Sequence, residues 1–219
     1  MGTLRFFALG IDEARDVFGA DDQLAGRLRT AAGQHWATPE RPRKTGLLGS
    51  LGPLFRRDPR LEVDPRRPTG ADIDALLTGR FIAPDRLGAA WQVLELWFAE
   101  IGWGDASWDL DPAGFDAVEF ALARAGLPSP YALGKLMALD ARLPIVPSAT
   151  TSCGYAKNSH VLRTAQALSV VMSDLADEHG DFAGEVLRFL NRFEQWGTAA
   201  AEAGRPAPDL LVVWHRTSD

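Results

Sequence analysis

Apolar residues are concentrated in two short runs at the two ends of the chain, residues 3–9 and 209–216. Each run has the length and the content of Leu, Val and Phe that are typical of a β-strand. An isolated strand would expose unpaired backbone donors and acceptors. The pattern therefore predicts that the two ends lie together in one small sheet. The proline-flanked residues 143–147 are a further extended piece that could join it.

Most of the chain between these two runs has the apolar spacing of amphipathic helices. The strongest helix is expected to begin at Pro84, a favoured first helical residue. Five large residues recur on its buried face: Leu87, Trp91, Leu94, Phe98 and Ile101. A further helix is expected over 113–125, and two long helices after Ser159 and Asp181. The sequence thus predicts a mainly helical α+β domain, with about six helices packed on a sheet of the N- and C-terminal strands.

Residues 38–70 interrupt this pattern with six prolines and four glycines, which exclude a long helix. Eight basic and four acidic side chains give the segment a net charge of +4. We expect a single domain over residues 1–219 that carries this segment as an insert or mobile loop. Its apolar residues are expected to dock on the domain or on a partner: Leu47, Leu48, Leu51, Leu54 and Phe55.

The net charge indicates which kinds of partner the protein can bind, and the cysteine content indicates which disulfide and metal sites it can form. The chain has a formal net charge of −6, and residues 71–219 alone carry −9. An acidic body makes nucleic acid an unlikely main partner and favours a basic protein. The one cysteine, Cys153, excludes an internal disulfide and a cysteine-pair zinc site. We therefore expect a cytoplasmic protein without a cofactor or a bound metal, and without a membrane-spanning segment.

A possible catalytic pair lies in the polar segment 150–160, which precedes a predicted helix. A thiol close to a helix N-terminus can have a lowered pKa, and His160 follows Cys153 by seven residues. These are the residue types of a nucleophile and its general base. The segment matches no established Cys–His signature, so an ordinary loop cysteine is the main alternative.

The densest group of aromatic and acidic residues lies between two predicted helices and contains Trp103, Asp105, Trp108 and Asp109. Exposed tryptophan beside aspartate is typical of surfaces that bind sugars or a cationic peptide. A connection held in place by the two tryptophans is the alternative. A calcium loop is excluded because Phe120 stands where the twelfth position requires a bidentate glutamate.

The order of these parts resembles a family of small bacterial proteins that share a domain of unknown function, and it is similar in outline to the YfbM-like proteins. The resemblance rests on the strand and short helix of residues 6–13, the aromatic helix of 91–101, and the helix and strand of 194–214. It covers residues 1–37 and 71–216, and the segment 38–70 departs from it. It implies a fold and supplies no catalytic residues.

These observations favour a non-catalytic module that binds another protein, with an immunity or antitoxin-like role as one possibility. A small enzyme that uses Cys153 and His160 is the first alternative. Weak nucleic-acid binding by the basic segment 38–70 is the second.

Overall fold

The computed structural model describes residues 2–36, 66–148, 150–175 and 177–216. Most of the segment predicted as a proline- and arginine-rich insert falls in residues 37–65. The expectations of mobility and of docking by its apolar residues therefore lie outside the described residues.

Four antiparallel strands form one sheet at the centre of the molecule, in the order β2-β1-β4-β3. The strands are β1 (Gly2–Leu9), β2 (Gly104–Asp109), β3 (Thr151–Ala156) and β4 (Asp209–Arg216). The two terminal strands, β1 and β4, are the inner pair of the sheet. The predicted α+β fold with a sheet of N- and C-terminal strands is confirmed.

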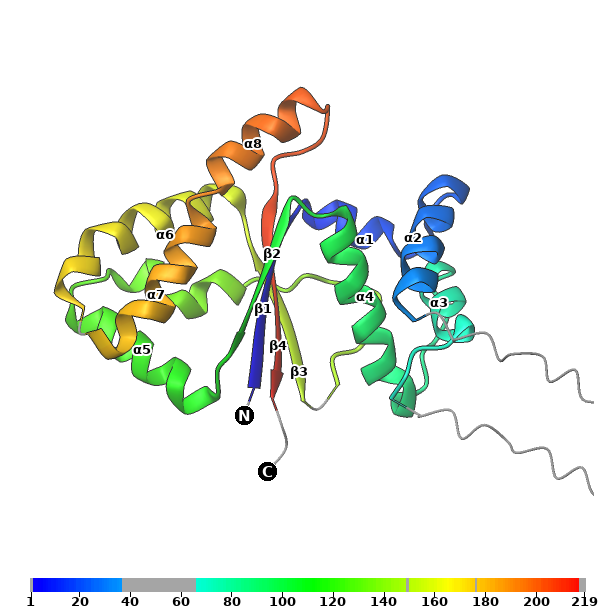
Figure 1. The fold of residues 1–219 in the computed structure, drawn as a ribbon, viewed down its shortest axis with the longest axis horizontal. Coiled ribbons are helices and arrows are strands. Elements are labelled where there is room, and N and C mark those ends of the chain that lie inside the picture. The colour runs from blue at the N-terminus through cyan, green and yellow to red at the C-terminus, as the bar shows by residue number, and fades with distance from the viewer. Residues whose placement is uncertain (1, 37–65, 149, 176, 217–219) are drawn as a thin grey trace, which may run out of the picture.

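Helices cover both faces of the sheet (Figure 1). One layer, here called the α4 face, consists of α1 (Ile11–Asp16), α2 (Asp22–His35), α3 (Gly70–Leu77) and α4 (Leu87–Ile101). The other layer, the α6 face, consists of α5 (Pro112–Arg124), α6 (Asn158–Val171), α7 (Asp177–Leu190) and α8 (Phe193–Glu202). Four short 3-10 helices complete the described chain: η2 (Pro84–Arg86), η3 (Ser129–Tyr131), η4 (Leu133–Met137) and η5 (Met172–Asp174).

Successive residues of β1 point to opposite faces of the sheet, so this one strand contributes to both cores. Leu4 and Phe6 are buried among the helices of the α6 face. Phe7 and Leu9 are buried against α4 and its neighbours. Burial on both faces explains why β1 is apolar almost throughout its length, which made it readable in the sequence.

The two edge strands, β2 and β3, were not predicted as strands from the sequence. Residues 104–109 were expected in a connection between helices and form β2, while residues 151–156 were expected in a polar loop and form β3. Residues 143–147 were expected to join the sheet and lie outside it. Both edge strands have six residues and polar side chains at several positions, so neither gives the strong apolar signal of a central strand.

The last long helix of the prediction is two helices in the structure. α7 begins at Asp177 and ends at Leu190, and α8 begins at Phe193. Asp181, after which the second long helix was expected to begin, lies inside α7. The break packs the Phe193 and Trp196 rings 5.3 Å apart, edge to face, and places both rings against Phe189.

Candidate functional site

A buried carboxylate on α4 is the centre of a polar cluster on the α4 face. Glu95 is only 4% exposed, although its neighbours on the helix are apolar. Its Oε2 lies 2.7 Å from Nη1 of Arg5 on β1, and its Oε1 accepts a short hydrogen bond from Nε2 of His215 on β4. A charge removed from water is costly unless it is paired, and these two partners supply the pairing.

The cluster continues through His215 to β3. Because the carboxylate of Glu95 can only accept, Nε2 of His215 must donate to it. In the neutral ring Nδ1 is then the acceptor, and it lies 3.0 Å from the hydroxyl oxygen of Thr151. Ser148 in turn donates to that hydroxyl oxygen over 2.8 Å. One directed chain of hydrogen bonds therefore links β3, β4, α4 and β1.

Thr151, His215 and Glu95 stand in the hydroxyl–imidazole–carboxylate order of a nucleophilic triad. A nucleophile must be reached by its substrate, however, and Thr151 is only 6% exposed. None of the three cavities described below is lined by Thr151. We therefore interpret the cluster as a structural connection between the strands rather than a catalytic site.

The sequence analysis missed this cluster, although it contained two signals. Glu95 is the single charged residue in the run from Leu87 to Phe98, which is otherwise apolar apart from one glutamine and one glycine. His215 alternates with Leu211 and Val213 and so shares their buried face. Only the packing of α4 on the sheet, which places Glu95 against His215, shows that the two signals meet.

Cys153 lies in β3 and packs against the apolar core of the α4 face. Burial raises the pKa of its thiol to about 12, and the nearby charges of Glu95 and Asp140 act in the same direction. A thiol activated by a lowered pKa was one alternative that the sequence left open. The raised pKa is evidence against it, because Cys153 stands in a strand beside a carboxylate and not at a helix N-terminus.

The structure does not bring His160 to Cys153. His160 lies in the first turn of α6, with its ring centroid 5.9 Å from that of Tyr131, which packs on the α6 face. Cys153 packs on the opposite face of the sheet. The predicted nucleophile and base are thus separated by the sheet itself. Burial, and secondarily the charge of Arg163, lowers the pKa of His160.

The two predicted tryptophan anchors are partly buried on the α6 face. Trp108 donates from Nε1 to Glu185 over 2.7 Å, and its ring meets Phe6 edge to face at 5.0 Å. The guanidinium of Arg205 covers the ring of Trp103 at 4.7 Å. These contacts hold β2 on the α6 helices, so the tryptophans leave little aromatic surface for a partner.

The two predicted aspartates are exposed and point away from the tryptophans. Asp105, Ser107 and Asp109 alternate along β2 with the half-buried Ala106 and Trp108. Asp105 lies 3.8 Å from Arg5, and Asp109 accepts a hydrogen bond of 3.3 Å from the hydroxyl of Thr3. β2 therefore presents an acidic row on its solvent side.

The backbone of β2 is open along the same row. Leu110 donates its N–H to the carbonyl of Gly2, which fixes the alternation of the hydrogen bonds between β2 and β1. By this alternation the N–H and C=O groups of Asp105, Ser107 and Asp109 point away from β1. No other described segment pairs with these groups, because β2 is the edge strand of the sheet.

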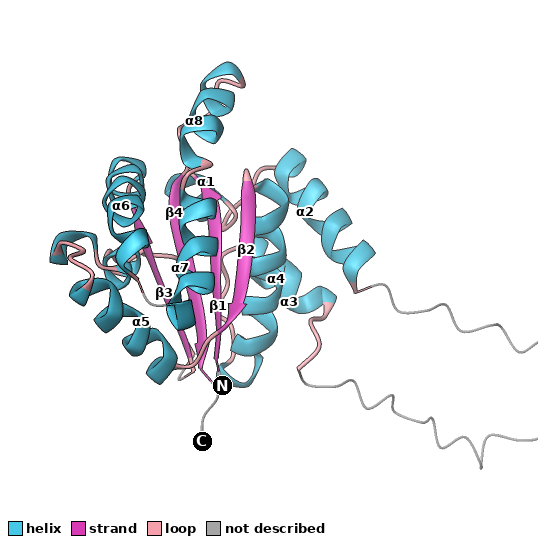
Figure 2. Ribbon diagram, turned by 60° about the vertical axis from the view of Figure 1, so that its left-hand side comes forward, coloured by secondary structure: helices cyan, strands magenta, loops and turns pink. Residues whose placement is uncertain are grey.

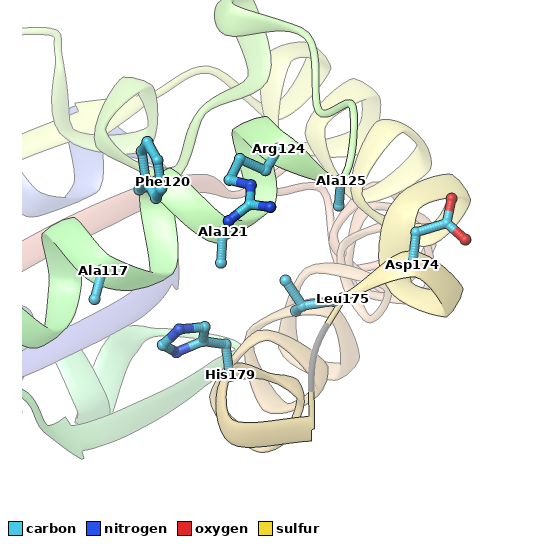
Figure 3. Close-up of a pocket in the computed structure, with 8 residues that line it drawn as sticks. All are labelled: Ala117, Phe120, Ala121, Arg124, Ala125, Asp174, Leu175 and His179. Carbon is cyan, nitrogen blue, oxygen red and sulfur yellow. The ribbon is translucent and has the colours of Figure 1, made fainter.

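A hollow of about 430 Å³ lies between α5 on one side and residues of η5 and α7 on the other (Figure 3). Phe120 and Arg124 of α5 border it, with Leu175 and His179 on the opposite side. Asp174 also lines it, so its charged side chains have opposite signs and favour neither an anion nor a cation. Another hollow, of about 220 Å³, has mainly apolar lining residues, and two of them, Phe81 and Val146, are strongly exposed to solvent.

Searches for other sites and for known relatives assign no activity. In the described part of the chain, no three His, Cys, Asp or Glu residues are arranged to hold a metal ion. Among the same residues, no helix has the length and apolar character needed to cross a membrane. The chain matches no protein-family model, no curated protein and no solved structure. The resemblance to YfbM-like proteins stays a prediction.

Proposed function

We propose that this protein is a non-catalytic binding module whose ligand is an extended, basic segment of another protein, added as a fifth strand along β2. The observation that carries the proposal is the open edge, where the backbone groups of Asp105, Ser107 and Asp109 face solvent. Strand addition uses such groups for affinity, while the side chains beside them select the partner.

The charges around this edge favour a basic partner. Asp105 and Asp109 stand on one side of the open edge, and the partner's side chains would alternate along the same row. The body of the chain carries a further excess of acidic residues. Opposite charges raise the association rate and disfavour acidic competitors. Masking a basic partner, as an immunity protein or an antitoxin does, would need this surface and no chemistry.

The same data weaken the alternative of a Cys153 enzyme, because the raised pKa leaves little thiolate at neutral pH. A cytoplasmic location would suit the lone, unbridged Cys153. The nucleic-acid alternative rests on the segment 38–70, most of which lies outside the described residues.

The test uses a proline at the centre of the open edge. Ser107→Pro removes an outward N–H that β1 does not use, so it blocks an added strand while keeping the β1–β2 hydrogen bonds. Ser107→Thr keeps the N–H and a strand-forming side chain and is the matched control. Wild type and both variants are purified from the native host, and captured proteins are quantified by mass spectrometry.

We expect wild type and Ser107→Thr to capture the same basic protein and Ser107→Pro to lose it by at least about tenfold. Charge reversal at Asp105 and Asp109 should weaken capture most at low salt. Equal capture by all variants, or recovery of the chain alone across several salt concentrations, would contradict the proposal. Circular dichroism of Ser107→Pro separates a blocked edge from an unfolded protein.

A further inference from the structure

A third hollow, of about 390 Å³, lies beside the β3 edge of the sheet, where η3 and η4 approach the junction of β3 and α6. We call it the β3 hollow. Its wall is almost entirely apolar and is formed by Pro130, Ala138, Leu139 and Ala156. A volume of this size is at the lower end of the range for small-molecule sites.

Three nitrogen-bearing side chains also line this apolar wall: Lys135, Lys157 and His160. Lys135 is exposed, and its ammonium has no ion-pair partner among the residues that the structure describes. Lys157 is 56% exposed and lies 3.7 Å from the carboxylate of Asp209, a distance at which water still competes. The hollow thus has positively charged side chains at its border and an apolar wall inside.

The third group, Nε2 of His160, is buried and has no hydrogen-bond partner within the described part of the chain. Buried polar atoms without a partner are rare in folded proteins. Burial lowers the pKa of His160, so the ring is neutral at neutral pH and Nε2 can donate or accept one hydrogen bond. Because Nε2 is closed to solvent, the His160 ring must turn before a ligand oxygen in the β3 hollow can reach this atom and supply the missing partner.

We propose that the β3 hollow binds a small organic anion with a flat apolar body, of which an aryl carboxylate is the simplest example. The carboxylate would pair with Lys135 and Lys157 and meet Nε2 of His160, while the ring covers the apolar wall. The N-terminus of α6 contributes little to this attraction, because the carboxylate of Asp209 already accepts the N–H of Asn158 over 2.9 Å. This inference does not depend on the partner proposed for β2, which lies at the other edge of the sheet.

The probe is 1-naphthoate, titrated into the full chain with carbon-13-labelled histidine and followed by NMR. We expect a saturable shift of the His160 ring signal, assigned with a His160→Gln variant, and no comparable shift of His35 or His215. The neutral isostere 1-naphthamide should bind at least about tenfold more weakly, because it lacks the charge that the two ammonium groups recognise.

Two variants on the border of the hollow test the site itself. Lys135→Met and Lys157→Met should each weaken naphthoate binding by about three- to tenfold. Arg188→Met, which removes one exposed positive charge from α7, is the matched control and should leave the affinity unchanged. Ala138→Trp should abolish binding by filling the hollow. These positions are exposed or lie at the border of the hollow, so the fold should tolerate the changes.

Three results would overturn the proposal. Absence of a saturable shift at His160 would show that the hollow is not occupied by the anion. Equal affinities for the acid and the amide would show that the hollow does not recognise charge. An equal loss of affinity in Arg188→Met and in the two lysine variants would show that naphthoate responds to overall charge and not to this site.

Discussion

Strands β2 and β3 form the two edges of the sheet (Figure 2). The two edges differ in what meets their outward backbone groups. At β3, Tyr155 exchanges two hydrogen bonds with Leu139, at 2.9 and 3.3 Å, and Thr151 donates to the carbonyl of Ser148 over 3.1 Å. At β2, the corresponding groups of three residues meet no other described segment. The chain therefore covers part of the β3 edge with its own backbone and leaves the β2 edge open.

The difference gives the two edges of one small sheet different surfaces for binding. An edge that is covered by its own chain cannot accept an added strand, so β3 directs any such partner to β2. The segment that covers β3 also forms a wall of the β3 hollow, through Ala138 and Leu139. The covering segment at β3 thus forms a concave surface that suits a small ligand. The open edge of β2 offers a linear surface that suits an extended peptide.

Glu95 connects the two edges. Its partner Arg5 lies 3.8 Å from Asp105 on β2, and its partner His215 contacts Thr151 on β3. A change at Glu95 should consequently affect both edges, while a change at one edge should stay local.

The largest effect is expected at Cys153 on the covered edge. Its thiol pKa of about 12, against an ordinary value of 9.0, leaves roughly a thousandfold less thiolate at pH 8 than in the unfolded chain. Iodoacetamide should therefore alkylate the native protein about a thousandfold more slowly than the protein in urea, as followed by mass spectrometry. Similar rates in both states would mean that the edge opens readily or that the thiol is activated.

Removal of the carboxylate that connects the edges should have the next largest effect. Glu95→Ala leaves Arg5 without its carboxylate in a half-buried position, and we expect a loss of about 3 kcal/mol in the free energy of unfolding. The lower end of the usual range applies because Arg5 and His215 keep some contact with water. Urea titration measures the loss.

Glu100→Ala on the same helix is the matched control. Its ion pair with Arg27 is exposed, so its removal should cost less than about 1 kcal/mol. Equal losses in the two variants would mean that the buried cluster does not hold the strands together.

A smaller effect is expected where η4 closes over β3. A methyl group at Gly154 would lie 2.0 Å from the carbonyl oxygen of Met137, which is backbone and cannot rotate away. Gly154→Ala should therefore destabilise the fold by about 2 kcal/mol and lower its melting temperature. Ser107→Ala on the open edge meets no such contact and should be nearly neutral. A neutral Gly154→Ala would show that η4 packs loosely on β3.

The comparison of the edges also explains what could be predicted from the sequence. β1 and β4 are buried on both faces, so their residues must be apolar and their pairing was predicted correctly. α4 was predicted for the same reason, because Trp91, Trp97 and Phe98 all face the core. Strong burial leaves a local pattern that a sequence shows directly.

The edge strands and the sites beside them leave no such pattern. β2 has exposed residues at alternate positions, and β3 is short and only partly buried. Their polar residues therefore resemble those of loops until the register with β1 and β4 is known. The cluster of Glu95 and His215 joins residues 120 positions apart, and the β3 hollow joins segments from η3 to α6. Such sites depend on tertiary contacts that no local spacing encodes.

The smallest predicted effect is a pH dependence that arises beside the covered edge. Burial lowers the pKa of His160 below its ordinary value of 6.5, so the unfolded chain binds a proton more readily than the fold does. The stability that results is fully present above pH 6.5 and is lost as the pH falls through the lowered pKa of the folded state. Between pH 7.5 and 5.5, wild type should accordingly lose more free energy of unfolding than His160→Gln does. This difference should be smaller than the losses expected for Glu95→Ala and Gly154→Ala.

His35→Gln, at an exposed position of α2, is the control and should follow wild type. A His160→Gln variant with the slope of wild type would place the imidazole in water and would remove the polar group on which the β3 hollow depends.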